Sequence, residues 1–215
     1  MKQQLTLLNS ILLLLVLLSA CGTTPEQQNA TAQKAIPYQD DEIAVIQSEC
    51  NTTDLLFAEA QLSMDTVHYA CTISQQRGKI DTFHYQDEVK LIRHTYYQGD
   101  HFGAIENYYL ANNQLSYVHV EETTWSFDPD FEPETDGTKH TRDDISEKYF
   151  YFAIAQPGQH PAPISCLKKE YVLRSAIELS TNPDEIRNQK VDCSNEAHVI
   201  FNRFLDLAGG KYETC

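Results

Sequence analysis

Three histidines are the residues best suited to metal chemistry in this sequence. His84, His94 and His119 fall on successive segments with strand character, and imidazole binds zinc, copper and nickel. The alternation of side chains along these segments does not place the three rings clearly on one face of a sheet. In a tyrosine-rich sheet, eight histidines will bring some rings close together by chance. We therefore predict no metal site, and we expect His101 and His160 to be surface loop residues.

Carboxylates alternate along the segment 128–137 in a way that resembles the start of a calcium-binding loop. Oxygen ligands at alternate positions suit Ca²⁺, and they are supplied by Asp128, Asp130, Glu132, Glu134 and Asp136. Pro133 stands at the sixth position, where an EF-hand needs glycine, and Lys139 stands where it needs glutamate. This excludes an EF-hand. An acidic, proline-stiffened loop is the preferred interpretation, and a non-standard cation site is the alternative.

The sequence offers no recognisable catalytic motif. It contains no Gly-x-Ser-x-Gly, no His-Glu-x-x-His and no glycine-rich phosphate loop. Glu121 and Glu122 are adjacent, so on a strand their side chains point to opposite faces and cannot act as a pair. We predict no catalytic residue and no cofactor, although scattered triads leave an enzyme open.

The first 20 residues have the layout of an export signal. A short basic start precedes an apolar run from Leu5 to Leu18, which is too short for the roughly 20 apolar residues of a membrane-spanning helix. Leu18-Ser19-Ala20-Cys21 resembles the lipobox of bacterial lipoproteins. The resemblance implies cleavage before Cys21, acylation of its thiol and anchoring in a membrane. Gly22, in place of the aspartate that retains lipoproteins in the inner membrane, favours the outer membrane with the domain facing the periplasm.

Three segments follow from this reading: a signal peptide over 1–20, an acylated cysteine with a flexible linker over 21–39, and one domain over 40–215. Disulfides are expected in an exported protein. With Cys21 acylated, five cysteines remain, so one thiol is left over. The connectivity is open, and the local pairings Cys50–Cys71 and Cys193–Cys215 are the first candidates. None of these cysteines has metal-site spacing.

The chain is strongly acidic, with 16 Lys and Arg against 31 Asp and Glu and a net charge of −15. This balance argues against nucleic-acid binding, which needs basic residues facing phosphates. It also argues against docking of the folded body on anionic lipids. A solvated, acidic surface is the simplest explanation.

The secondary-structure pattern predicts an α+β domain, an antiparallel meander of about six strands with helices at both ends. Strand character is found in 67–73, 80–86, 89–98, 105–110, 115–127, 148–155 and 164–173. Asn112 and Asn113 predict a turn because asparagine tolerates positive φ. Gly99, Asp100 and Gly103 are expected to break the chain. In 115–127 one face is expected to carry Leu115, Tyr117, His119, Thr123, Trp125 and Phe127, and the other Val118 and Val120.

Helices are expected before and after these strands. Asp40 or Asp41 is expected to cap a helix ending at Cys50, and Thr53 or Asp54 a second one. Asn182-Pro183 predicts a later helix start. The clearest helix is expected to be capped by Ser194 or Asn195 and to end at Gly209-Gly210. Its apolar stripe comprises Ala197, Ile200, Phe201, Phe204, Leu205 and Ala208.

Paired aromatic residues recur on the predicted hairpins. Glu106-Asn107-Tyr108-Tyr109-Leu110, followed after a turn by Leu115-Ser116-Tyr117-Val118, resembles the paired-tyrosine hairpins of many small, uncharacterised bacterial lipoproteins. The resemblance covers about 80–173, lacks the usual turn glycine and brings no catalytic residue with it. About half of the sheet aromatics are expected in the core, and the others would form an exposed strip suited to binding; they are Tyr96, Tyr97, Tyr108, Tyr109, Tyr117, Trp125, Tyr149 and Tyr151.

These observations favour a lipoprotein of the cell envelope, anchored through Cys21, whose domain binds a protein or another envelope component without catalysis. One alternative is an envelope inhibitor or immunity-like protein with an acidic surface that faces a basic partner. A second alternative is a metal-dependent hydrolase that uses the strand histidines.

Overall fold

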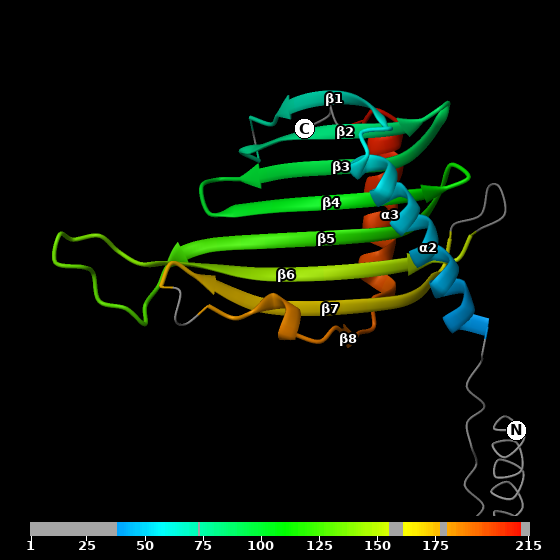
Figure 1. Ribbon diagram of the computed structural model, residues 1–215. Helices are drawn as coiled ribbons and strands as arrows, with labels where there is room; N and C mark the ends of the chain where they lie inside the picture. Colours follow the sequence, from blue (N-terminus) through cyan, green and yellow to red (C-terminus); the bar gives the residue numbers. More distant parts are fainter. Residues whose placement is uncertain (1–37, 73, 155–160, 177–179, 212–215) are drawn as a thin grey trace, which may run out of the picture. The chain divides into compact units, whose positions relative to one another are not determined.

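The computed structural model describes residues 38–72, 74–154, 161–176 and 180–211 (Figure 1). All of these belong to one compact unit, Pro37–Cys215. Cys21, the export signal, the linker and Cys215 lie outside the described residues. Among the described helices, none is both long and apolar enough to cross a membrane.

An antiparallel sheet of eight strands forms the body of the domain, and each strand pairs with the next one along the chain. The α+β class and the meander are therefore confirmed, whereas the expected number of strands was too low. The shortest strand, β8, has two polar residues and no hydrophobic pattern, so only its pairing with β7 defines it. The strands are β1 (Ser63–Ala70), β2 (Gln76–Tyr85), β3 (Glu88–Gln98), β4 (Phe102–Ala111), β5 (Gln114–Phe127), β6 (Thr141–Phe152), β7 (Pro163–Arg174) and β8 (Gln189–Lys190).

Short turns connect the central strands. Asn112 and Asn113 join β4 to β5 with φ of 51° and 59°, the backbone that a two-residue hairpin turn needs, and this confirms the predicted turn. Gly99 has a φ of 62° between β3 and β4. The expectation that Gly103 breaks the chain was wrong, because Gly103 lies inside β4 and pairs with Tyr97.

One long helix precedes the sheet. The helix α2 (Tyr38–Ala58) runs without interruption through the region where two helices were expected. The reason is that the hydroxyls of Thr52 and Thr53 donate to the carbonyls of Ser48 and Glu49 one turn earlier. These threonines therefore lie inside the helix instead of starting a new one.

After the sheet, Pro183–Glu185 (η2) forms a single 3-10 turn, although a longer helix was expected there. The helix α3 (Ser194–Ala208) forms where it was predicted, but its N-cap is Cys193 and not Ser194 or Asn195. Its buried residues are Ala197, Ile200, Phe204 and Leu207, whereas Leu205 and Ala208 from the expected stripe are exposed.

The two helices pack on opposite faces of the sheet, α2 in front of the strands and α3 behind them in Figure 1. Tyr151 packs with Ile46 and Cys50 of α2. The neighbouring Phe150 and Phe152 belong to the core with Phe204 of α3. Both helices cover the end of the sheet near the β4–β5 turn, so no described helix lies over either face at the end formed by the β3–β4 turn.

A β-bulge in β5 places Leu115 on the other face of the sheet from the one predicted. The β4–β5 register shifts between Tyr109 and Leu110, so that Tyr109 pairs with Tyr117 and Leu110 with Leu115. Because the bulge adds one residue at Ser116, Leu115 joins Val118 in the α3-side core. The sequence pattern had placed Leu115 on the face of Tyr117.

The disulfide pattern differs from the local pairings expected from the sequence. Cys193 bonds to Cys166, 27 residues away, with a Cα–Cα distance of 6.0 Å. Cys50 is a buried free thiol, whereas Cys71 is disulfide-bonded, so these two cysteines do not pair with each other. The physical reason is sheet pairing: Val191 donates its N–H to the carbonyl of Cys166, and this brings Cys193 next to β7.

Candidate functional site

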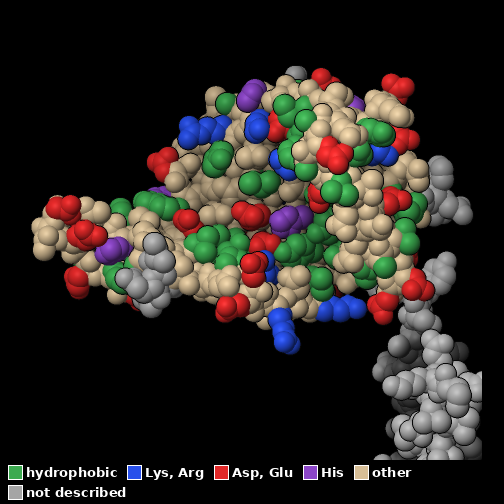
Figure 2. All heavy atoms as spheres, in the orientation of Figure 1, with side chains coloured by type: hydrophobic (Ala, Val, Ile, Leu, Met, Phe, Trp, Pro, Cys, Tyr) green, Lys and Arg blue, Asp and Glu red, His purple; other side chains and the backbone are tan. Residues whose placement is uncertain are grey.

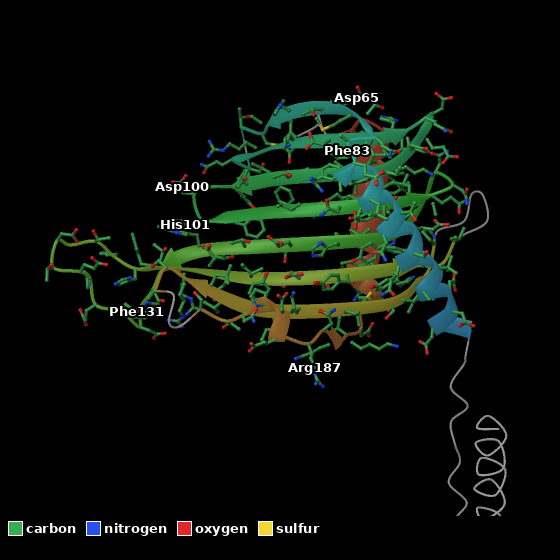
Figure 3. The ribbon with its side chains drawn as sticks, in the orientation of Figure 1. Asp65, Phe83, Asp100, His101, Phe131 and Arg187 are labelled. Carbon is green, nitrogen blue, oxygen red and sulfur yellow. A yellow bond between two sulfur atoms is a disulfide. The ribbon has the colours of Figure 1, made fainter. Side chains whose placement is uncertain are left out.

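A groove of about 670 Å³ lies on the face of the sheet that carries α2, over the half that this helix leaves open. Its floor comes from β2 to β5, and the β3–β4 turn closes one end; Figure 3 labels Asp100 and His101 at that turn. In Figure 2 the surface beside α2 is recessed, and hydrophobic, acidic and histidine side chains meet there. The side chains from these strands that line the groove include Arg77, Tyr97, Ile105, Glu121, Thr123 and Trp125.

Cross-strand register brings these side chains to one face. Arg77 pairs with Tyr97, and Tyr97 pairs with Gly103; opposed residues of an antiparallel sheet point to the same side. A Cβ at Gly103 would lie 3.2 Å and 3.3 Å from two ring atoms of Tyr97. The missing side chain therefore lets the Tyr97 ring lie down over β4, while 51% of Tyr97 stays exposed.

Aromatic rings form the end wall of the groove. His101 stacks on Trp125 with ring centroids 4.9 Å apart, and Phe127 meets the edge of Trp125 at 5.2 Å. The main chain locks this arrangement, because Trp125 donates its N–H to the carbonyl of His101 at 2.8 Å. The indole is therefore held in a fixed position beside the groove.

Two charged floor residues have no ionic partner among the described residues. Arg77 makes no ion pair there, and neither does Glu121. In the β5–β6 register Glu121 stands directly opposite Glu147, a like-charge pair that destabilises a sheet. The groove thus contains one unpaired cation and one unpaired anion.

Glu147, in contrast, is satisfied within the chain. Lys169 Nζ lies 2.9 Å from one of its oxygens, His119 Nε2 lies 3.3 Å from the other, and the Tyr149 hydroxyl donates to it. Burial on its own raises the pKa of Glu147, but the hydrogen bonds from Tyr149, Lys169 and Tyr171 outweigh it and lower the pKa to about 2. Glu147 therefore keeps its negative charge next to Glu121.

A second polar cluster lies on the opposite face, beneath α3, around the fully buried carboxylate of Glu106. His94 Nδ1 lies 3.0 Å from this carboxylate, the Tyr108 hydroxyl donates to it at 2.7 Å, and Arg203 of α3 pairs with it. Burial raises the pKa of Glu106, but the hydrogen bond from His94 and the charge of Arg203 outweigh it and bring the pKa below its ordinary value. The cluster ties α3 to the centre of the sheet.

Hydrogen bonds continue from this carboxylate through His94 to β1. A carboxylate only accepts, so His94 donates to Glu106 from Nδ1, and its Nε2 is hydrogen-bonded to the Tyr69 hydroxyl, 2.6 Å away. Gln76 in turn donates to the Tyr69 oxygen at 2.8 Å. Tyr69 reaches His94 by crossing Gly78, where a Cβ would lie 2.9 Å from the Tyr69 hydroxyl.

The three strand histidines do not converge. His94 pairs in register with Glu106, whereas His119 pairs with the next residue, Asn107, and so lies on the other face. His84 contacts Asp65 at 3.3 Å. Among the described residues no group of three or more His, Cys, Asp or Glu side chains could hold a metal ion.

The acidic segment 128–137 is partly neutralised by the chain itself. Both oxygens of buried Asp128 accept from Arg174, at 2.9 Å and 2.8 Å, and Asp130 also pairs with Arg174. Asp136 accepts from the N–H of Thr138 in a local turn. A guanidinium thus takes the place that the alternative cation site would need at Asp128 and Asp130.

The free thiol does not suit nucleophilic chemistry. Burial, together with the charges of Asp54 and Glu49, raises the pKa of Cys50 to about 12, so the thiolate is scarce at neutral pH. Its hydrophobic neighbours are Ile46 of α2 and Tyr151 of β6.

Comparison with models of protein families, with curated proteins and with solved structures finds no match to this chain. The site therefore has to be interpreted from its own geometry.

Sequence reasoning identified part of this site and missed the rest. Tyr97 and Trp125 were expected on the sheet, and Tyr97 is exposed while Tyr96, Tyr108 and Tyr151 are buried. Neither the unpaired charges of the groove nor the Glu106–Arg203 pair was predicted. Gly78 and Gly103 were a usable signal, because a glycine inside a strand often marks a place where another group approaches the backbone closely.

Proposed function

We propose that this chain is a lipid-anchored protein of the cell envelope that binds an envelope component through the groove on the α2 face, without catalysing a reaction. The lipobox ending at Cys21 supports the anchor, and the composition of segment 21–39 supports a flexible linker. Gly22 supports the outer membrane, with the domain in the periplasm.

One observation carries the binding role: the groove combines fixed aromatic rings with charges that have no partner among the described residues. Exposed aromatic residues and arginine are the types that dominate binding energy at interfaces. The candidate acid–base residues are engaged elsewhere, since Glu106 and Glu147 are held ionised by their neighbours. This supports binding over hydrolysis.

A second candidate is an envelope inhibitor or immunity-like protein. The observation in its favour is the exposed acidic loop between β5 and β6, where Asp130 and Glu134 side chains are 57% and 58% exposed. A basic partner would meet this loop rather than the groove. Replacing Glu132 and Glu134 by Gln would weaken such a complex and leave groove binding unchanged.

The anchor is tested by substituting Cys21→Ser and fractionating cells. The native protein should be found in the outer membrane and carry a diacylglycerol mass on a peptide beginning at Cys21. The variant should leave the outer-membrane fraction. A native protein that begins at Met1 and is free in the cytosol would contradict the anchor.

Binding is tested by placing a photo-crosslinking amino acid at Tyr97, on the groove floor, or at Leu55, which is exposed on α2. In intact cells, we expect one specific adduct from position 97, none from position 55, and loss of the adduct when Thr123→Trp fills the groove. Equal labelling from both positions, or none from Tyr97, would contradict the proposal.

A further inference from the structure

We infer that the groove binds a short, extended peptide of about four to five residues that presents an ammonium group to Glu121 and a carboxylate to Arg77. This inference rests on the proposed binding function and names the class of ligand for the same groove. Three features support it: the Glu121 carboxylate, which faces a like charge; the Arg77 guanidinium, which has no ionic partner among the described residues; and the distance between the two.

The ammonium end follows from the pair of acidic residues on β5 and β6. Glu121 and Glu147 face each other in register, but only Glu147 has a cation, Lys169, at 2.9 Å. Glu121 is left with a like charge opposite and no ionic partner among the residues that the structure describes. A primary ammonium on a ligand would remove this repulsion, as an opposite charge does across a strand pair.

The carboxylate end follows from Arg77 on β2. This guanidinium lines the groove and is exposed, in a chain with nearly twice as many acidic as basic residues. Within the described part of the chain it nevertheless forms no ion pair. The planar fork of arginine matches a carboxylate with two parallel hydrogen bonds.

The spacing fixes the length of the ligand. Arg77 and Glu121 stand on β2 and β5, three strand spacings apart, which corresponds to about 14 Å across the sheet. Arg77 is in register with Thr123, two residues or about 7 Å from Glu121 along the strand, so the two backbone positions are about 16 Å apart. An extended peptide covers about 3.3–3.6 Å per residue, so about four to five residues bridge the two positions. Between them lie Tyr97 and Ile105, both with exposed apolar surface, which suits apolar side chains in the middle of the peptide.

The test uses the detergent-solubilised full-length protein and the tetrapeptide alanyl-leucyl-leucyl-alanine, with free ends, N-acetylated or C-amidated. Calorimetry measures affinity, and the fluorescence of Trp125, which is the only tryptophan in the chain and lines the groove, reports where the peptide binds. We expect each blocked end to weaken binding about five- to tenfold, as for a hydrogen-bonded charge contact.

Two substitutions show which protein residue binds each end of the peptide. With Glu121→Gln, N-acetylation should no longer weaken binding, while amidation still does; with Arg77→Gln the pattern should be reversed. The matched controls Glu132→Gln and Arg187→Gln, both at exposed positions outside the groove lining, should behave like the native protein. Figure 3 shows Arg187 below the sheet, away from the β3–β4 turn.

Equal affinity for the free and blocked peptides, or no binding of any of them, would overturn the inference. So would saturable binding of a neutral oligomer of N-acetylglucosamine that both charge substitutions leave unchanged. If Tyr97 still gives its specific adduct in cells, the proposed function survives these outcomes. If that adduct is also missing, both the function and the ligand class fail.

Discussion

The Gly78→Ala substitution tests how the sheet accommodates the buried cluster beneath α3. A Cβ at this position would press against the carbonyl oxygen of Thr95 and lie 2.9 Å from both Tyr69 Oη and Tyr96 Cβ. The carbonyl belongs to the neighbouring strand β3 and cannot turn aside as a flexible side chain can. The strands must therefore move apart, and Tyr69 must also leave His94.

The size of the effect follows from these contacts. Overpacking a well-packed interior costs about 1–3 kcal/mol, and each hydrogen bond lost, from Gln76 to Tyr69 and from Tyr69 to His94, costs about 1 kcal/mol. The lower chain entropy of alanine in the unfolded state offsets about 0.5–1 kcal/mol. We expect a net destabilisation of about 3 kcal/mol, and a fall in melting temperature of about 6–12 °C for a domain of this size.

Thermal melts followed by circular dichroism provide the measurement, and Gly103→Ala is the matched control. There the added Cβ would lie close to the movable ring of Tyr97, at 3.2 Å, and at an ordinary contact distance of 3.9 Å from the carbonyl oxygen of Tyr96, so the loss of stability should be below about 1 kcal/mol. Tyr69→Phe should be costly in the native protein and cost much less when combined with Gly78→Ala, because the hydrogen bond is then already broken. The reasoning would be refuted if Gly78→Ala and Gly103→Ala lowered the stability equally little. It would also be refuted if the stability losses from Tyr69→Phe and Gly78→Ala simply added in the double variant.

Three further predictions concern a carboxylate, a disulfide and a thiol. The pKa of Glu147 lies at about 2, below the ordinary 4.5, so the ionised carboxylate should stabilise the folded domain fully above about pH 4.5, and this contribution should fade as the pH falls towards 2. Denaturant titrations at several pH values should show that the free energy of unfolding changes less with pH in this range for Glu147→Gln than for the native protein; an equal change would contradict the assignment. Replacing both Cys166 and Cys193 by Ala opens a loop closed across 27 residues and should lower the free energy of unfolding by about 3.5 kcal/mol; a loss below about 1 kcal/mol would show that the bond does not constrain the unfolded chain. Because burial raises the pKa of Cys50 to about 12, a thiol reagent should label it only after unfolding, with Cys50→Ala as the control, and rapid labelling of the native protein would show that the thiol is accessible.

The contrast between the two sheet faces shows how far a sequence pattern can be taken. Alternation correctly put Tyr117 and His119 on one side of β5 and Val118 on the other, because neighbouring residues of a strand always point to opposite faces. It failed at Leu115, where the bulge changes the count by one residue. It also failed at Thr53, whose hydroxyl satisfies a carbonyl inside α2 instead of capping a new helix.

The sequence by itself determined the properties that depend on neighbours in the chain: the α+β content, the Asn112–Asn113 turn, the helix α3 and the acidic balance. Tertiary structure alone decided which groups meet across the sheet. It paired Cys166 with Cys193, buried Glu106 against Arg203, and left Glu121 facing Glu147 beside an open groove. Such meetings depend on register and on which end of the sheet the helices cover, and both are set by packing over many strands rather than by any local run of residues.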